Sequence, residues 1–276
     1  MDAKIVTLIL SKEVREARRN SWFLLFAAIF AGLSLTVSLL GLASLGSIGS
    51  AGFGRTTASL LNLIVLVVPL MGLMLGALSI VGEREQGTLA TLLSQPVLVE
   101  EVFLGKFLGL AAALVSALLG GFGLTALVIA RGSGPARLED YLLLAAWTCL
   151  FGLGYLSLGF LVSAIARKTA AAMGVALLLW LVSVFLSDLG LIGTAIVLRL
   201  SPRALLWLSL LNPAQVFKLL ILDSIGGNLE ILGPGGLYAT EVFGRWLRPA
   251  LAALLAAWLT IPLAVSLVLS RNRGAS

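Results

Sequence analysis

Long apolar runs, each about 20 residues or more and separated by charged or glycine-rich turns, constrain this chain most strongly. A helix needs about 20 apolar residues to cross the hydrocarbon core of a bilayer. Six runs of this kind occur, and they cover residues 21–45, 58–81, 104–130, 141–166, 169–197 and 249–270. The sequence therefore predicts an all-α integral membrane protein, with a six-span transmembrane domain over residues 21–270.

The composition excludes most soluble functions. Of the 276 residues 59% are hydrophobic and 12% are charged, and that charged fraction is about half the usual one for a soluble domain. The chain has no histidine and a single cysteine, Cys149, so it offers no Ser-His or Cys-His pair and no cysteine or histidine metal site. We expect a non-catalytic chain without its own metal or cofactor, and nothing points to nucleic acid as a partner.

The basic residues set the expected orientation. Residues 1–20 mix apolar and charged side chains at helical spacing, which predicts an amphipathic helix on the membrane surface. The larger group of bases would share one side: Lys4, Lys12, Arg15, Arg18, Arg19, Arg84, Lys106, Arg167, Lys168, Arg271 and Arg273. The short loops opposite carry only Arg55, Arg131 and Arg137. By the positive-inside rule, both termini lie in the cytoplasm.

Residues 82–103 form the most informative loop. Glu83, Glu85, Glu100 and Glu101 surround a short amphipathic stretch, 88–93, that must end before Pro96. A short helix of this kind between two spans suits a groove in a partner protein. An ordinary solvated loop is the alternative.

The same loop resembles the signature loop of ABC-2 type transporter permeases, which lies between their second and third spans. The resemblance rests on the string from Glu83 to Leu89, then Leu92-Leu93, Pro96 and Gly105-Lys106. With the first helix and the six spans it covers nearly the whole chain, and it implies a fold like that of type V exporters. Glu100-Glu101 departs from the pattern, since related permeases often have a hydroxyl residue and then a basic one there.

The resemblance implies that this loop is cytoplasmic and meets a separate ATPase, which binds ATP and Mg. The implied coupling positions are Glu83, Arg84, Glu85, Gly87, Thr88, Leu89, Leu92, Leu93 and Pro96. No GxxxxGK[ST] string occurs in the sequence, so ATP must be handled by another chain. The implied complex holds two ATPase copies and two copies of this chain in the bacterial inner membrane.

The external segment 199–248 is the only part large enough for structure outside the membrane. Ser201-Pro202 predicts a helix start, and Asn212-Pro213 predicts a break between two short helices. These helices either meet an external partner or fold back on the bundle as a re-entrant or lid-like loop. The expected partner contacts are Leu211, Asn212, Pro213, Val216 and Phe217.

The segment 211–219, with residues 236–239, also resembles the permease subunits that support copper-site maturation of nitrous oxide reductase. That narrower resemblance implies a periplasmic copper-handling partner. Within this chain, Met71 and Met74 share a helix face and could offer thioether sulfur to Cu(I), but core packing is the favoured interpretation. Asp188 is interpreted as the outer end of the fifth span rather than as an intramembrane functional group.

We therefore expect a permease subunit that couples a cytoplasmic ATPase to a periplasmic partner. An exporter of a lipid, drug or peptide is the first alternative, and an ATP-independent carrier or channel is the second. Spacings of small residues, Gly72 to Gly76 and Gly105 to Gly109, would allow close helix packing or dimerisation.

Overall fold

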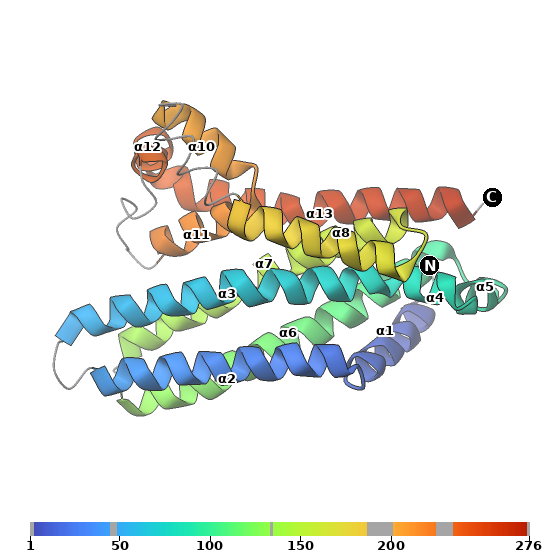
Figure 1. Ribbon diagram of the computed structural model, residues 1–276, viewed down its shortest axis with the longest axis horizontal. Helices are drawn as coiled ribbons and strands as arrows, with labels where there is room; N and C mark the ends of the chain where they lie inside the picture. The colour runs from blue at the N-terminus through green and yellow to red at the C-terminus, as the bar shows by residue number, and fades with distance from the viewer. Residues whose placement is uncertain (1–2, 45–48, 133–134, 187–200, 225–233, 275–276) are drawn as a thin grey trace.

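The described residues of the computed structural model, 3–44, 49–132, 135–186, 201–224 and 234–274, are almost entirely helical. The long helices run side by side as a bundle (Figure 1). They are α2 (Ser21–Ser44), α3 (Gly49–Ser79), α6 (Val99–Gly132), α7 (Pro135–Ile165), α8 (Thr169–Leu181) and α13 (Leu247–Gly274). The all-α membrane fold expected from the apolar runs is therefore present.

Shorter helices gather at the two ends of the bundle. The terminal end, which carries both chain termini, also holds α1 (Ala3–Ala17), α4 (Val81–Glu85) and α5 (Thr88–Leu93) (Figure 1). The opposite, distal end holds η1 (Val182–Leu186), α10 (Pro202–Leu210), α11 (Pro213–Ser224), α12 (Pro234–Phe243) and η3 (Gly244–Trp246). The termini and the charged loop thus share one end, as the distribution of bases predicts.

Five helical segments are long and apolar enough to cross a bilayer, and a sixth results if the bent pair α10–α11 is counted as one span. Only described residues enter this count, and the apolar part of α2 within it, Phe23–Val37, is shorter than a full span. The chain is therefore a multi-pass membrane protein. Its assignment of six spans with α2 as the first stays a prediction.

Several helices begin earlier than the apolar runs indicate. The loop expected over residues 46–57 is mostly helix, because α3 begins at Gly49. Glycine and serine weaken a helix but do not forbid it when the helix continues into a packed span. The turn expected over residues 131–140 is shorter, since α6 runs to Gly132 and α7 starts at Pro135. Proline is well suited to that first position, where its missing N–H costs nothing.

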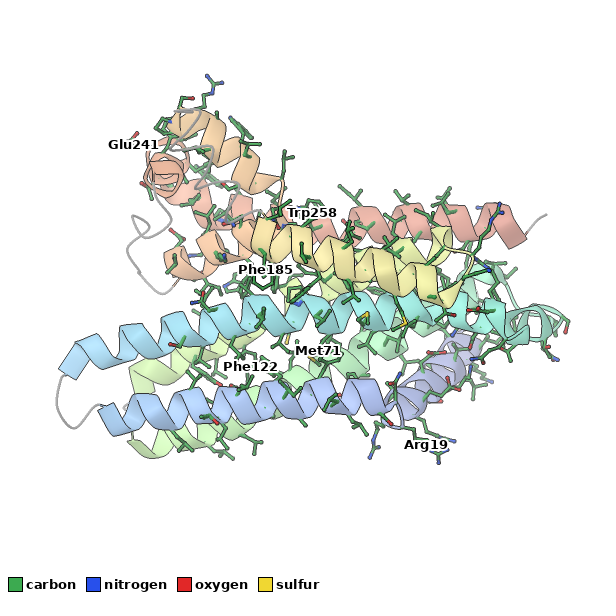
Figure 2. All side chains as sticks on the ribbon, viewed as in Figure 1. Arg19, Met71, Phe122, Phe185, Glu241 and Trp258 are labelled. Atoms are coloured by element: carbon green, nitrogen blue, oxygen red, sulfur yellow. The ribbon has the colours of Figure 1, made fainter. Side chains whose placement is uncertain are left out.

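The core of the bundle is the contact between α3 and α7, which approach closely through glycines. A Cβ atom added to Gly72 would lie 2.8 Å from the carbonyl oxygen of Gly152, and one on Gly76 would lie 2.4 Å from that of Leu156. The small-residue spacing thus serves packing between helices of one chain. Met71, which is 1% exposed, lies in the same core (Figure 2). Met71 is packed as expected.

The second small-residue pair seats α1 on α6. A Cβ on Gly105 would lie 2.8 Å from the Cβ of Ile9, and one on Gly109 would lie 2.6 Å from the Cβ of Glu13. Without side chains at these two positions, α1 lies directly against α6 and brings Glu13 beside the neighbouring Lys106. Arg19, at the bend between α1 and α2, is exposed (Figure 2).

The distal helices confirm the predicted start and break. The hydroxyl of Ser201 caps α10 by accepting from the amide of Ala204, and α10 and α11 meet at a bend of 109° around Asn212. Helix α11 packs on α7 and α13, which agrees with the alternative in which this segment folds back on its own bundle. Asp188 and the part of the fifth span beyond Leu186 lie outside the described residues.

Candidate functional site

The charged loop between α3 and α6 begins at a sharp but fully hydrogen-bonded break. The hydroxyl oxygen of Ser163, on α7, accepts hydrogen bonds from the backbone amides of Ile80 and Val81 at 3.0 and 2.9 Å. These amides open α4, where intrahelical acceptors are missing. A serine on a neighbouring span therefore fixes the point at which the chain leaves the bundle.

Glu83 points inward and joins two further helices. Its Oε1 atom accepts from the ammonium groups of Lys12, on α1, and Lys106, on α6, each at 2.9 Å. Lys106 also donates to Glu13 of α1 at 2.7 Å. The four side chains form one network, which we call the charge cluster: Lys12, Glu13, Glu83 and Lys106. It holds α1, α4 and α6 together at the terminal end.

Most of the charge cluster is shielded from solvent. The side chain of Lys106 is 2% exposed, that of Glu13 is 6% exposed and that of Glu83 is 16% exposed. Burial raises the pKa of the Glu13 carboxyl, and the attraction of Lys106 opposes this effect only in part. Burial alone would lower the pKa of Lys12, but its hydrogen bond to Glu83 raises it overall. Buried ions of this kind depend on each other, because each one left alone is costly.

Arg84 and Glu85 bind two other spans. The guanidinium of Arg84 donates from Nη1 to the carbonyl oxygen of Ala166, at the end of α7, across 3.0 Å. The carboxylate of Glu85 accepts from the backbone amide of Thr169 at 2.8 Å and also from its hydroxyl. Thr169 is the first residue of α8, so Glu85 caps that helix from outside. Three successive residues of the loop thus contact four other helices, counting α1 and α6 for Glu83.

Beyond this anchored stretch the chain turns into α5. Gly87 has a φ of +75°, which side-chain-bearing residues rarely adopt, and the short helix begins directly after it. Helix α5 covers Thr88–Leu93, the range predicted from the sequence. Thr88 and Thr91 are exposed, while Leu89 and Leu92 are half-buried. Pro96 is exposed in the connection that leads to α6.

The two glutamates that depart from the family pattern both have structural partners. The carboxylate of Glu101 accepts from the amide of Leu98 at 3.1 Å and so caps the start of α6. Glu100 lies 3.5 Å from Arg271, near the end of α13. Of the long helices, α6, α7, α8 and α13 therefore contact residues between 80 and 101 through the side chains and backbone groups described above.

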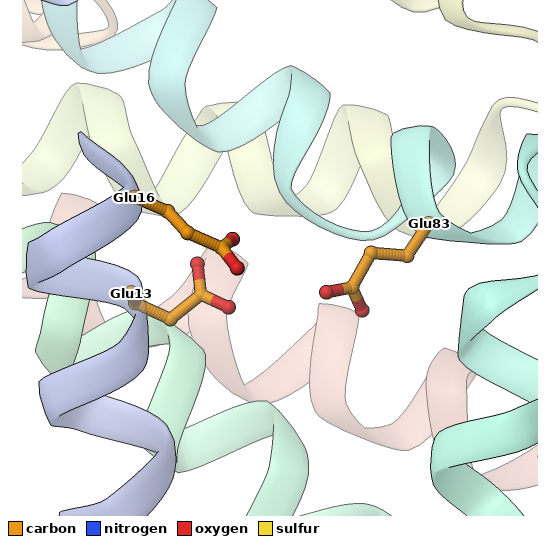
Figure 3. Close-up of side chains that lie close together, drawn as sticks. All are labelled: Glu13, Glu16 and Glu83. Carbon is orange, nitrogen blue, oxygen red and sulfur yellow. The ribbon is translucent and has the colours of Figure 1, made fainter. Parts of the chain in front are cut away.

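A cavity of about 290 Å³ lies beside the charge cluster, between α1, α2, α3 and α6. Its polar wall includes Glu13 and Glu16 of α1 and Glu83 of α4. Their carboxylates converge, and one oxygen of each lies within 4.8 Å of the others (Figure 3). Two ammonium groups already neutralise much of this charge, since Lys12 and Lys106 both contact Glu83. The arrangement is that of an ion-pair network.

The expected external contacts divide sharply by burial. Val216 and Phe217 are fully buried, and Phe217 stacks on Phe151 of α7 with ring centres 4.2 Å apart. Pro213 is also buried, whereas Leu211 is 71% exposed. Asn212 is half-buried and bonds to the fifth span. Of this set, Leu211 offers the side chain that a partner could reach.

Sequence reasoning missed the inner half of the site. It placed Glu83, Arg84 and Glu85 together but gave no role to Glu13, Ser163 or Thr169 as their partners. The usable signal was Lys106, a base at the start of a long apolar run and next to Gly105. A small residue beside a buried base indicates that another helix with a carboxylate comes close.

Comparison with known proteins decides the family. The model of the ABC-2 family transporter proteins matches residues 7–274. The chain belongs to the ABC-2 transporter permease family. It is 35% identical over 277 residues to the probable ABC transporter permease protein NosY of Pseudomonas aeruginosa, covering 98% of each chain. It is 32% identical to the protein of the same name from Stutzerimonas stutzeri, covering 96% of this chain and 97% of that one.

Membership in the ABC-2 family gives the charged loop a context. Permeases of this family are the non-catalytic membrane subunits of ABC transporters and work with an ATPase subunit and a second permease. The loop is the described segment in which residues from α1, α4, α6, α7 and α8 meet at one end of the bundle. Short polar contacts join this loop to α1, α6, α7, α8 and α13.

Proposed function

We propose that this chain is the membrane subunit of an ATP-driven complex and that α4 and α5 form the docking point for a separate cytoplasmic ATPase. The proposal rests on the way in which successive residues of the loop contact different helices. Glu83 bonds to α1 and α6, Arg84 to α7 and Glu85 to α8, while α5 beside them exposes Thr88 and Thr91. A partner that moves α5 would therefore displace several spans at once.

The charge distribution supports a cytoplasmic position for this end. Both termini, α4 and α5 lie together, and the bases of the terminal end outnumber those of the predicted short loops opposite (Figure 1). The protein would then reside in the bacterial inner membrane with its ATPase-facing end inside. ATP and Mg would be bound by the ATPase, and two copies of each chain would make the working complex.

We infer from the NosY relatives that the complex acts in copper-site maturation of nitrous oxide reductase, with a periplasmic copper-handling protein as its external partner. The distal helices suit a role in binding. Leu211, Trp207 and Trp246 are 71%, 54% and 64% exposed. Helix α10, which carries Trp207 and ends at Leu211, packs on α11 and α12, and η3, which carries Trp246, packs on α13. Exposed aromatic and aliphatic side chains on a fixed support are typical of partner surfaces.

Co-purification tests this function. The chain is extracted from its native membrane in mild detergents, and mass spectrometry identifies the proteins that accompany it. An ATPase with a periplasmic copper-handling protein is the expected result. An ATPase alone would favour an exporter of a lipid, drug or peptide, and repeated recovery without any ATPase would overturn the proposal in favour of a carrier or channel.

A variant on α5 makes the test specific for the docking point. Reversing the charge of Glu83 would break the buried charge cluster as well as any partner contact, so it is a poor probe. Thr91→Arg changes an exposed side chain of α5 instead. We expect it to lower the co-purified ATPase about tenfold or more, as loss of a central contact does. Arg203→Glu, an exposed change at the distal end, is the control and should leave the ATPase bound.

A further inference from the structure

Helix α8 is tied at both ends by side-chain hydrogen bonds. At the terminal end, Glu85 caps its first residue, Thr169. At the distal end, the hydroxyl of Ser183, in η1, donates to Oδ1 of Asn212 at 2.9 Å. The amide Nδ2 of Asn212 donates back to the carbonyl oxygen of Ser183 at 2.7 Å. Helix α8 therefore connects the charged loop with the external helices through hydrogen bonds at both of its ends, and α7 and α13 also contact both regions.

The distal tie lies at the bend of the external helix pair. Asn212 separates α10 from α11, and its Oδ1 also accepts from the amide of Ala214 at 2.9 Å, which caps α11. Ser183 in turn bonds to the hydroxyl of the buried Tyr155, on α7. Asn212 thus sets the position of the bend relative to the end of α8. A shift of η1 would move the point about which α10 and α11 are angled.

Between its two ends, α8 is only lightly held by the rest of the chain. In the apolar window of Thr169–Leu186, 17% is buried inside the chain, against 72% for the span that contains α3. The indole of Trp180 donates to the carbonyl oxygen of Leu66, on α3, at 2.9 Å. Eighteen helical residues span roughly 27 Å, close to the thickness of a bilayer core. Helix α8 therefore crosses the bundle from the charged loop to the external helices with little of its surface buried inside the chain.

We propose that α8 and η1 act as a strut that carries displacement of the charged loop to the external helix pair. Glu85, Ser183 and Asn212 are then positioning residues at its two ends. The segment η1 is a π-helix, and it contains Ser183, the residue that bonds to Asn212. Short π-helical segments often occur at functional sites. The source of the displacement rests on the proposed function, because the ATPase would supply it. The mechanical link itself is a property of this chain alone.

Hydrogen exchange of the purified chain in lipid nanodiscs, without any ATPase, tests the strut. Glu85→Ala cuts the terminal tie. Asn212→Asp removes the amide donor to the Ser183 carbonyl, one of the two bonds of the distal tie, while keeping an oxygen that caps α11 and accepts from the Ser183 hydroxyl. We expect Glu85→Ala to speed exchange in Pro202–Leu210 and Pro213–Ser224 about fivefold, and to add a clearly smaller increase in the Asn212→Asp background. Such non-additivity would indicate that Glu85 and Asn212 affect the external helices through the same helix, α8.

Matched controls separate the strut from general loosening. Glu100→Ala removes another carboxylate that binds a neighbouring helix at the terminal end, and it should leave the external helices unchanged. Tyr155→Phe removes the second partner of Ser183 but keeps the bonds to Asn212, so the response to Glu85→Ala should persist in that background.

Three results would overturn the strut. The first is an unchanged exchange rate in the external helices after Glu85→Ala. The second is an equal increase of that rate when Glu85→Ala is made in the Asn212→Asp background. The third is loss of protection throughout α8, which would mean that the helix unfolds instead of moving. Should Asn212→Asp fail to fold, Ser183→Ala removes the other bond of the distal tie, from the Ser183 hydroxyl to Asn212, and the additivity test is the same. Co-purification of the ATPase is measured separately, so failure of the proposed function and failure of the strut give different results.

Discussion

The ammonium of Lys106, on α6, donates a hydrogen bond to the carboxylate of Glu13, on α1, across 2.7 Å in a region nearly closed to solvent. This contact is possible because Gly105 and Gly109 have no side chains to hold α1 away from α6. Glu83 joins the same ammonium from α4. Close packing of α1 on α6 at these glycines therefore allows the buried charge cluster to form where the charged loop begins.

Removing the ammonium of Lys106 should destabilise the charge cluster and with it the folded chain. Lys106→Met keeps much of the volume but leaves Glu13 and Glu83 without the ammonium that both contact. We expect a loss of about 3–5 kcal/mol, as found when one partner of a buried ion pair is removed. The melting temperature in detergent measures it. Lys168→Met, at an exposed lysine, is the control, and equal melting temperatures for the two variants would contradict a buried role for Lys106.

The raised pKa of Glu13 gives its contribution a definite pH dependence. Burial raises the pKa of this carboxyl above its ordinary value of 4.5, so the folded chain holds the proton more tightly than the unfolded chain does. Its contribution to stability is then present at low pH and lost as pH rises through the folded pKa. Compared with Glu13→Gln, the wild-type melting temperature should fall as pH rises above 4.5. A difference that stays constant over that range contradicts this expectation.

The α3–α7 contact should not tolerate a methyl group. In Gly76→Ala the new Cβ would lie 2.4 Å from the carbonyl oxygen of Leu156 and 2.8 Å from the Cα of Gly159, and backbone atoms cannot move aside alone. We expect a loss of about 1–3 kcal/mol, typical of overpacking. Gly123→Ala, on α6, meets nothing within 4 Å and should be neutral or slightly stabilising. Thermal unfolding compares the two variants.

The turn at Gly87 should matter for coupling more than for folding. Its φ of +75° lies where a side chain costs about 1–3 kcal/mol, so Gly87→Val should redirect α5. We expect weaker ATPase co-purification with a small change in melting temperature. Gly82→Ala, in α4 with nothing within 4 Å, keeps an ordinary helical position and should bind the ATPase as the wild type does. Equal binding by both variants would show that the orientation of α5 is unimportant.

Local features of this chain were predictable because they depend on neighbouring residues. Proline and hydroxyl residues mark helix ends, so the range of α5, the cap at Ser201 and the break at Asn212 follow from sequence alone. Helices α3 and α7 begin before the predicted spans, 58–81 and 141–166, because hydropathy reports the membrane-spanning part of a helix and not its full length.

Contacts between distant segments were not predictable in the same way. Glycine spacing indicated close packing near Lys106 but could not indicate that Glu13 would be the neighbour. Likewise, the amphipathic pattern of residues 214–222 predicts one buried face without saying what covers it. In the structure, α7 covers Phe217, which is why a residue expected to meet a partner is buried within its own chain.

Site-specific photo-crosslinking is the most direct test that the charged loop docks an ATPase. A photoreactive amino acid is placed at Thr91, on the exposed side of α5, or at Arg203, at the distal end, in otherwise native membranes. If α5 is the docking point, residue 91 crosslinks to an ABC ATPase and residue 203 gives no ATPase crosslink. A crosslink to the ATPase from residue 203 but not from residue 91 would contradict it.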